Sequence, residues 1–273
     1  MPDRLLVCTP SRLSTFEDCP RRYRYSYLDR PAPPRGPAWA HNSLGASVHT
    51  ALRNWYGLPA ARRQPSALLA LLRATWVGEG YRDREQERVA FGVALRWLEG
   101  YVADLDPEQE PVGVERVVAF KTGTIAFSGR VDRIDRRAAL GDALAIVDYK
   151  TGQAGLGADD ARGSRTLALY AYAAERVFRR RCRVVELHHL PTQSVVTHEH
   201  TDGSLARHVA RAEAVARDIA DAQQAVRAGT EPDAAFPTRP GPMCSWCDFR
   251  SACPAGAAAP ARVPWARVLQ NSG

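Results

Sequence analysis

The chain has 273 residues, of which 45% are hydrophobic and 25% are charged, so it can bury a core as one large domain or two small ones. Its apolar runs are all shorter than the roughly 18 residues of a membrane span, and its first residues lack the pattern of a secretion signal, so we expect a cytoplasmic protein without membrane contact. The net charge of +7 favours an anionic partner such as nucleic acid, although a solvated arginine-rich surface would give the same charge.

The first hundred residues predict a helical region. A helix that begins near Ser11 carries Cys19, and a second helix carries His49 beside an apolar stripe. The apolar residues that recur at helical spacing are Leu13, Phe16, Tyr23 and Tyr27 in the first helix, and Leu44, Val48, Leu52 and Trp55 in the second. We expect two further helices at about 66–78 and 81–105.

From about residue 111 the apolar residues alternate, which is the period of a strand. Three strands are predicted, at about 112–120, 124–134 and 143–150, and their short connections favour an antiparallel meander. The elements that follow are a helix at about 165–180, two strands in CRVVELHHL and SVVTHEH, and a long helix from Ser204 to about Arg227. This order predicts an α/β fold with an αβββαβ core and additions.

Cysteines gather near the end of the chain. A proline-rich linker leads to CSWCDFRSAC and then to an Ala/Pro-rich tail that we expect to be partly disordered. Cys244, Cys247 and Cys253 have the spacing C-x2-C-x5-C, which lets thiolates converge on one metal centre. A disulfide is the alternative, and a reducing compartment disfavours it. Cys8 and Cys182 lack such a pattern, and we expect them to bind no metal.

One strand carries an acid and an amine at suitable spacing for a site. Asp148 and Lys150 lie two residues apart in ALAIVDYK, so both side chains leave the same face of the sheet. Asp132 lies on the preceding strand, and antiparallel pairing in the right register brings it close to Asp148. Two carboxylates can bind Mg2+ or Mn2+, and a lysine can orient or deprotonate water, so this group suits phosphodiester hydrolysis. The alternative is an ordinary salt bridge at the end of a strand.

Lysine is rare in this chain. Of 37 basic residues only Lys121 and Lys150 are lysines, and the others are arginines. Since arginine stays protonated, a lysine in such a composition favours a place where a compact amine is needed, although Lys121 has no such role in view. Neither lysine follows a glycine, which excludes a phosphate-binding P-loop, so an ATP-driven motor would be a separate chain.

Several segments together resemble the RecB-like PD-(D/E)XK nucleases, and the resemblance spans most of the chain. These segments are LSTFEDCPRRYRYSYL, GASVHTAL, GRVDRID, VDYKTG and the terminal cysteines. The chain is similar to the AddB-type nuclease domain and to the stand-alone CRISPR-adaptation nucleases that carry an iron-sulfur cluster. The resemblance implies a restriction-endonuclease-like αβββαβ core, DNA as the substrate, and Mg2+ or Mn2+ as the cofactor.

The same resemblance implies the roles of individual residues. Asp132 and Asp148 are implied to be metal ligands, and Lys150 is implied to be catalytic. His49 becomes a further metal ligand, although a lone histidine beside an apolar stripe is more often structural. The carbonyl group of Tyr149 is implied to be another ligand.

The comparison with the family pattern leaves two interpretations open for each of two further positions, Glu115 and Tyr170. Glu115, in GVERVVAF, lies where related sequences often have an acid, and the alternative is a strand residue that faces solvent. The family commonly has Gln-x-x-x-Tyr on the helix after the lysine strand. Here Thr166 occupies the glutamine position and Tyr170 matches the tyrosine. A hydrogen bond is therefore lost or comes from a neighbour such as Arg165, and Tyr170 belongs either to the site or to the core.

By resemblance, Cys19 is the fourth ligand of a [4Fe-4S] cluster, because related nucleases take one cysteine from an N-terminal helix ending in Cys-Pro. Zn2+ at the same four cysteines is the alternative, since zinc and iron-sulfur centres share thiolate ligands. Basic residues near these cysteines either contact DNA phosphates or form solvated surface, and they are Arg21, Arg22, Arg24 and Arg250.

We therefore expect one integrated domain with a helical region at 1–110, a nuclease core at 111–229 and a cysteine segment at 230–273. The predicted function is a metal-dependent DNA exonuclease or end-processing nuclease in recombination or repair, acting alone or beside a separate helicase subunit. The alternatives are a non-catalytic DNA-binding scaffold of a helicase-nuclease complex and a CRISPR spacer-processing nuclease.

Overall fold

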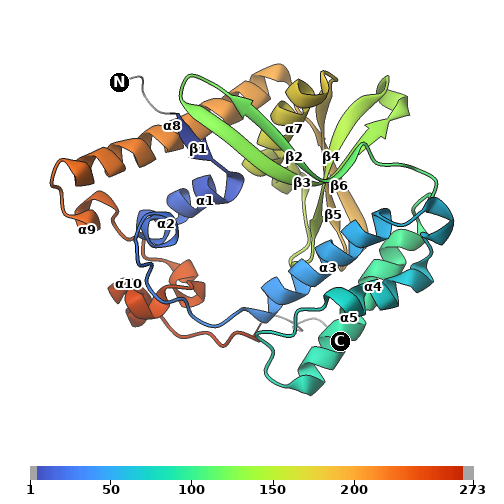
Figure 1. Cartoon of the computed structure of the whole chain (residues 1–273), viewed down its shortest axis with the longest axis horizontal. Helices are drawn as coiled ribbons and strands as arrows, with labels where there is room; N and C mark the ends of the chain where they lie inside the picture. Colours follow the sequence, from blue (N-terminus) through green and yellow to red (C-terminus); the bar gives the residue numbers. More distant parts are fainter. Residues whose placement is uncertain (1–4, 267–273) are drawn as a thin grey trace. The chain divides into compact units, whose positions relative to one another are not determined.

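The computed structural model of the chain describes residues 5–266 (Figure 1). Contacts within the chain divide it into two compact units. The cysteine unit comprises Met1–Pro37, Ala119–Gly129 and Asp202–Arg262, and the sheet unit comprises Ala38–Val118, Arg130–Thr201 and Val263–Gly273. Each unit is assembled from segments that are distant in sequence. The expected division into three successive segments stays a prediction.

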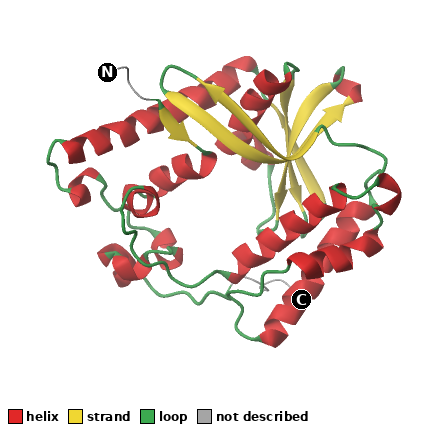
Figure 2. Cartoon of the chain, viewed as in Figure 1, coloured by secondary structure: helices red, strands yellow, loops and turns green. Residues whose placement is uncertain are grey.

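The strands form one mixed sheet (Figure 2). They are β1 (Leu6–Cys8), β2 (Gly113–Lys121), β3 (Ile125–Arg137), β4 (Ala143–Lys150), β5 (Cys182–His189) and β6 (Ser194–Glu199). Strand β3 is antiparallel to β4, β4 is parallel to β5, and β5 is antiparallel to β6, while β2 pairs with β3. This mixed sheet with its helices confirms the predicted α/β class.

Strand β4 lies in the core of the sheet unit. Its residues 143–147 are all buried, so both faces of the strand are covered. Val147 and Tyr149 belong to the same apolar cluster as residues of α3 (Ala40–Tyr56), α4 (Leu68–Thr75) and α5 (Arg84–Ala103). Helix α7 (Arg165–Phe178) also packs against β4 and β5. The last residues of β4, which carry Asp148 and Lys150, therefore extend from a rigid, buried strand.

Two predicted helices of the sheet unit are shorter than expected, for local reasons. The backbone of Trp76 is extended at the end of α4, and the side chain of Asp83 caps α5 by accepting from the N–H of Gln86 at 2.8 Å. The short helix α6 (Ala158–Gly163) and strand β1 were not predicted, because neither is long enough to show a clear period. None of the helices between residues 5 and 266 has the length and apolar character that spanning a bilayer requires.

The cysteine unit brings the first helices of the chain together with residues from Asp202 to Arg262. Strand β1 pairs in parallel with the first residues of β3, and the long helix α8 (Asp202–Arg227) contacts both β1 and α1 (Pro10–Asp18) (Figure 1). The remaining helices of this unit are α2 (Pro20–Tyr27), α9 (Pro232–Ala235) and α10 (Pro254–Ala258), with 3-10 turns at Pro242–Trp246 and Arg250–Ala252. The expected disorder of the tail falls partly on residues 267–273, which lie outside the described residues.

The single helix expected from Ser11 to Tyr27 is wrong. The structure has two helices, and Cys19 lies between them with extended backbone angles, φ −165° and ψ 113°. The cause is Pro20, because a proline disfavours the helical conformation of the residue before it and has no N–H for a continuing helix. The break places Cys19 in a link between helices and not on a helix face.

Candidate active site

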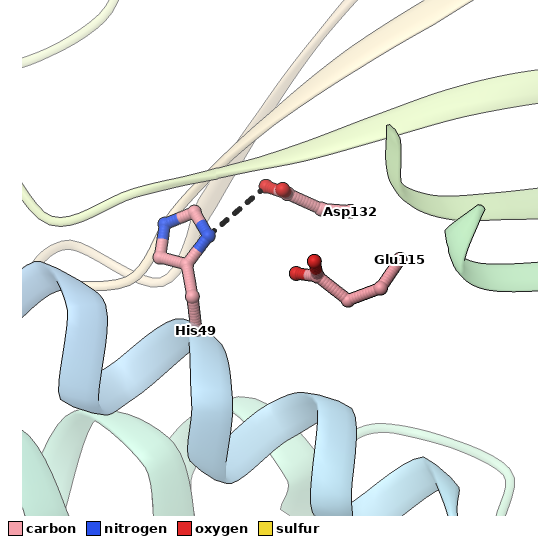
Figure 3. Close-up of side chains that lie close together, drawn as sticks. All are labelled: His49, Glu115 and Asp132. Carbon is pink, nitrogen blue, oxygen red and sulfur yellow. Dashed lines mark ion pairs between the residues drawn. The ribbon is translucent and has the colours of Figure 1, made fainter. Parts of the chain in front are cut away.

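Three potential metal ligands converge in the sheet unit (Figure 3). His49 comes from α3, Glu115 from β2 and Asp132 from β3, and one ligand atom of each lies within 4.8 Å of the others. His49 Nδ1 is 3.2 Å from Asp132 Oδ2. Figure 3 shows the carboxylate of Glu115 directed toward this pair. All three side chains are half-buried, and the described part of the chain contains no other group of three such residues.

The pairing of β3 with β4 brings two predicted acids together. Arg133 pairs with Val147 at the end of the ladder, so Asp132 faces Asp148 one position further along. The backbone N–H of Tyr149 donates to Asp132 Oδ2 at 3.0 Å. The expected juxtaposition is thus present in the structure, while the roles of both acids as metal ligands stay predictions.

Lys150 lies beside Asp148 on the same strand. Its Nζ is 2.5 Å from Asp148 Oδ2, and this buried oxygen has no hydrogen bond of ordinary geometry. Burial raises the pKa of Asp148, the Lys150 ammonium opposes that shift and Asp132 adds to it, and the net direction is upward. The Lys150 ammonium therefore does not fully offset burial and the neighbouring carboxylate, and a divalent cation would add further positive charge beside the two acids.

His49 is influenced by the same acids. Burial alone would lower the pKa of His49, but the hydrogen bond to Asp132 and the charges of Asp132 and Asp148 outweigh burial and raise it. The carboxylates that could bind a cation therefore also favour a proton on the imidazole. Because a metal needs the neutral imidazole, a proton and a cation would compete for His49.

Glu115 points into the cluster and not into solvent. Its side chain is only 16% exposed and forms an ion pair of 2.6 Å with Arg130. Its φ of +51° lies in the left-handed region, which residues other than glycine rarely adopt. Such local strain is frequent at functional sites, and here it accompanies a carboxylate directed at His49 and Asp132. The solvent-facing alternative is therefore wrong, and the role of Glu115 as a ligand stays a prediction.

The donor set fits a hard divalent cation. Carboxylate oxygens are the preferred ligands of Mg2+ and Mn2+, and an imidazole nitrogen is a common ligand of transition-metal ions. Three carboxylates, those of Glu115, Asp132 and Asp148, lie in or next to the cluster, and one buried oxygen of Asp148 lacks an ordinary hydrogen bond. With a cation bound, this arrangement could neutralise a phosphate, while Lys150 supplies a proton-carrying amine beside it.

Tyr170 of α7 lies within electrostatic range of the site. Burial raises the pKa of Tyr170, and the charges of Asp148 and Asp132 raise it further. Thr166 lies in the first turn of α7, which is capped by Ser164. Whether Tyr170 serves the reaction stays a prediction.

A buried hydrogen-bond network that sequence reasoning missed adjoins the site. Arg133 is 3% exposed, and its Nη2 lies 2.9 Å from Asp135 Oδ2. Its Nη1 donates to the hydroxyls of three tyrosines, which are Tyr56, Tyr101 at 3.0 Å and Tyr149 at 3.1 Å. The aromatic ring of Tyr149 thus faces this network, on the opposite side of the strand from Asp148 and Lys150.

The hydrogen bonds of this network form a closed ring, which runs from Asp135 through further residues back to Arg133. Arg137 Nη1 donates to Asp135 Oδ2 at 3.1 Å, and Arg137 Nη2 donates to Glu186 Oε2 at 2.5 Å. Glu186 Oε2 lies 2.9 Å from His188 Nε2, and His188 Nδ1 lies 2.7 Å from the hydroxyl of Tyr101. One sequence signal was available, because residues 133, 135 and 137 are all charged and share one face of β3.

The four predicted cluster ligands line one pocket of the cysteine unit. They are Cys19, Cys244, Cys247 and Cys253, all half-buried and none of them in a disulfide. Burial raises the pKa of Cys247, and the charge of Cys19 adds to the rise. Cys8 and Cys182 are buried and do not line this pocket.

Two arginines near these cysteines have structural contacts. Arg21 and Arg24 are 6% and 9% exposed, and they form ion pairs of 2.9 and 2.8 Å with Asp233. Arg21 Nε also donates to the carbonyl of Phe236 at 2.9 Å. These contacts connect α2 to the segment around α9, so the solvated-surface alternative is wrong for both residues, and a role in phosphate contacts stays a prediction. Arg22 lines the pocket and is less buried.

Comparison with known proteins gives one family. The model of the PD-(D/E)XK nuclease superfamily matches residues 7–254. No curated protein matches the chain. Among solved structures, the protein SSO0001 is similar with a TM-score of 0.41 and 16% sequence identity, over 92% of this chain and 86% of that one.

Proposed function

Because the chain belongs to the PD-(D/E)XK nuclease superfamily, we propose that it is a Mg2+- or Mn2+-dependent nuclease that hydrolyses phosphodiester bonds in DNA. The observation that carries this proposal is the convergence of His49, Glu115 and Asp132 beside the pair formed by Asp148 and Lys150. We assign the chain to the RecB-like branch of the family. Its biological role would be exonucleolytic or other processing of DNA ends in recombination or repair, alone or with a separate helicase subunit.

The proposed cation ligands are His49, Asp132 and Asp148, with Glu115 and the carbonyl of Tyr149 as further oxygen donors. When bound, the cation neutralises charge that develops on the phosphate and makes a water molecule more acidic. The acids are held in place by their strands, because Asp132 accepts from the backbone of Tyr149 and faces Asp148 across the ladder. A pre-arranged set of acids needs little rearrangement during the reaction.

Lys150 has suitable chemistry to act on the attacking water. Its side chain is 45% exposed while its Nζ lies 2.5 Å from Asp148, so the amine can contact both the carboxylate and a group that enters from solvent. As an ammonium, Lys150 would orient the water or stabilise a phosphate oxygen. In its neutral form it would accept the proton of the water.

The proposed [4Fe-4S] cluster would be held by Cys19, Cys244, Cys247 and Cys253, which line one pocket and form no disulfide. Zn2+ at the same four cysteines is the alternative, because both centres use thiolate ligands. The cluster would connect the α1–α2 link to the C-terminal segment within the cysteine unit.

The metal content of the cysteine site can be tested directly. Protein purified without oxygen is expected to contain about four irons and four sulfides per chain, and the Cys244→Ala variant is expected to lose them. Stoichiometric zinc without iron would show that the alternative metal occupies the site.

Nuclease activity is tested on end-labelled single- and double-stranded DNA with Mg2+ or Mn2+. Wild type is expected to degrade DNA, and Lys150→Ala is expected to be inactive. Lys121→Ala provides a matched control, because Lys121 is the only other lysine and is exposed on β2. Equal degradation by wild type and Lys150→Ala would contradict the site assignment, and DNA binding without cleavage by wild type would favour a scaffold.

A further inference from the structure

A second pocket, which no predicted ligand explains, adjoins Lys150 in the sheet unit. It has a volume of about 480 Å3, within the range of small-ligand sites. Its walls come from the first turns of α3, from Trp97 of α5, from the segment that follows β4, and from the end of β5. Because Lys150 lines this pocket and also pairs with Asp148, the pocket opens directly beside the proposed site of hydrolysis.

The wall that follows Lys150 is fixed by buried contacts. His189 is 1% exposed, and its Nε2 donates to the carbonyl of Gly152 at 2.6 Å, while its Nδ1 lies 2.7 Å from Thr192 Oγ1. The N–H of Leu190 donates to the carbonyl of Lys150 at 2.9 Å. These bonds attach the segment after β4 to the end of β5, so the pocket is formed before any ligand binds.

The lining has a composition that differs from that of the metal cluster. It combines the indole of Trp97 and the aliphatic side chains of Leu44 and Leu156 with the polar side chains of His41 and Gln153. No Asp or Glu is among the described residues of the lining, and Lys150 contributes a cationic group at one side. Such a pocket suits a flat, uncharged ring with polar edges that is attached to an anionic chain.

We propose that this pocket receives one unpaired nucleobase next to the phosphate that is cut, with the base stacked on Trp97. The inference rests on the proposed nuclease function and specifies its substrate class. A base within a duplex is paired and stacked on its neighbours, so it can enter a side pocket only when it is unstacked. A base in single-stranded DNA is free to enter. Stacking on an aromatic side chain tolerates every base, so the pocket selects single-stranded DNA without selecting a sequence.

The test uses single-stranded oligonucleotides that each lack one base, with the abasic position moved along the strand. Cleavage by wild type is mapped at nucleotide resolution, and it is expected to slow roughly 5- to 150-fold when the missing base lies at one fixed position beside the cut. The Trp97→Ala variant is expected to cut the intact strand as slowly as wild type cuts that abasic strand. Trp97→Ala is also expected to cut the abasic strand at the same rate as the intact strand. Trp97→Phe, which keeps an aromatic face, is expected to restore most of the rate.

Trp76→Ala is the matched control. Trp76 packs against the same apolar cluster as Trp97 and contacts the rings of Tyr81 and Phe91, but it does not line the pocket. Its loss is expected to leave the response to missing bases unchanged. The proposal is overturned if Trp76→Ala and Trp97→Ala change the response to missing bases equally. It is also overturned if wild type cleaves every abasic oligonucleotide as fast as the intact strand.

A measurement of DNA binding tests the base pocket separately from the nuclease activity. The same oligonucleotides are bound to the Lys150→Ala protein in Ca2+, and affinity is measured by fluorescence anisotropy. A loss of affinity at one abasic position that disappears in the double variant with Trp97→Ala supports the base pocket even if no DNA is cut. Cleavage by wild type with no base-dependent affinity or rate overturns the pocket and leaves the nuclease function intact.

Discussion

Replacing Arg133 with methionine tests whether the buried network stabilises the strands that carry the site. The guanidinium is almost fully buried and makes five contacts with four groups, two with the carboxylate of Asp135 and one with each of three tyrosine hydroxyls. Methionine keeps much of the length and apolar surface of the side chain but removes the charge and every donor. Arg137 would remain as the partner of Asp135.

The expected loss is large because the partners stay buried. Removing one member of a buried ion pair typically costs about 3–5 kcal/mol, since the remaining charge is left without compensation. The partial compensation by Arg137 reduces this cost, while the tyrosine hydroxyls that lose a donor add to it. We therefore expect Arg133→Met to lower the free energy of unfolding by about 3 kcal/mol, a large fraction of the stability of an ordinary domain.

Urea unfolding followed by circular dichroism measures this change through the midpoint and the slope. Arg88→Ala is the control, because Arg88 also pairs with an acid but is 74% exposed in the helix surface, and no measurable change is expected. Arg133→Lys keeps the charge without the planar fork and should recover only part of the stability. A midpoint for Arg133→Met within error of wild type, at equal slope, would refute the stabilising role of the network.

Two further predictions concern single acids. Glu115→Gln removes a charge from the cluster of possible ligands and is expected to weaken Mn2+ binding at least about tenfold by calorimetric titration, whereas unchanged affinity would place Glu115 outside the metal site. Burial tends to raise the pKa of Glu186, but hydrogen bonds from His188 and Arg137 outweigh it and lower the pKa from 4.5 to about 2. The contribution of Glu186 is therefore complete above about pH 4.5, is lost as the pH falls toward 2, and amounts to about 3 kcal/mol. The stability difference between wild type and Glu186→Gln should shrink over this range in urea unfolding, and a difference independent of pH would contradict the assignment.

The sequence predicted the helices and strands in which apolar residues recur with a regular spacing. Strands β2, β3 and β4 begin and end close to the expected positions, and Asp148 lies on the same strand face as Lys150 because side chains alternate. The restriction-endonuclease-like fold expected from the resemblance agrees with the family match and the mixed sheet. The break at Cys19 was also available from the sequence, because Pro20 follows it directly.

Features that depend on contacts between distant segments were not predictable in this way. The direction of Glu115 depends on a left-handed backbone conformation that nothing in its neighbours demands, and on Arg130 as its partner. The network joins β3 to α5 and β5, so its closure depends on the sheet order. The base pocket likewise combines Trp97 with the end of β5, and an isolated tryptophan on a helix is most simply interpreted as core.

The contrast between Arg133 and Lys150 leads to a final prediction. Arg133 is 3% exposed, and its planar guanidinium donates to acceptors that are fixed in place. Arginine suits this position because it stays protonated. Lys150 is 45% exposed at its side chain and faces one carboxylate, so its compact amine can also contact a group that enters from solvent. In a chain that otherwise uses arginine for nearly every basic position, this difference implies that charge alone does not suffice at residue 150. Lys150→Arg is therefore expected to bind DNA as well as wild type but to cleave it at least about a hundredfold more slowly, the usual contribution of a proton-transfer group. Cleavage by Lys150→Arg at a rate close to that of wild type would show that residue 150 acts as a positive charge and not through proton transfer.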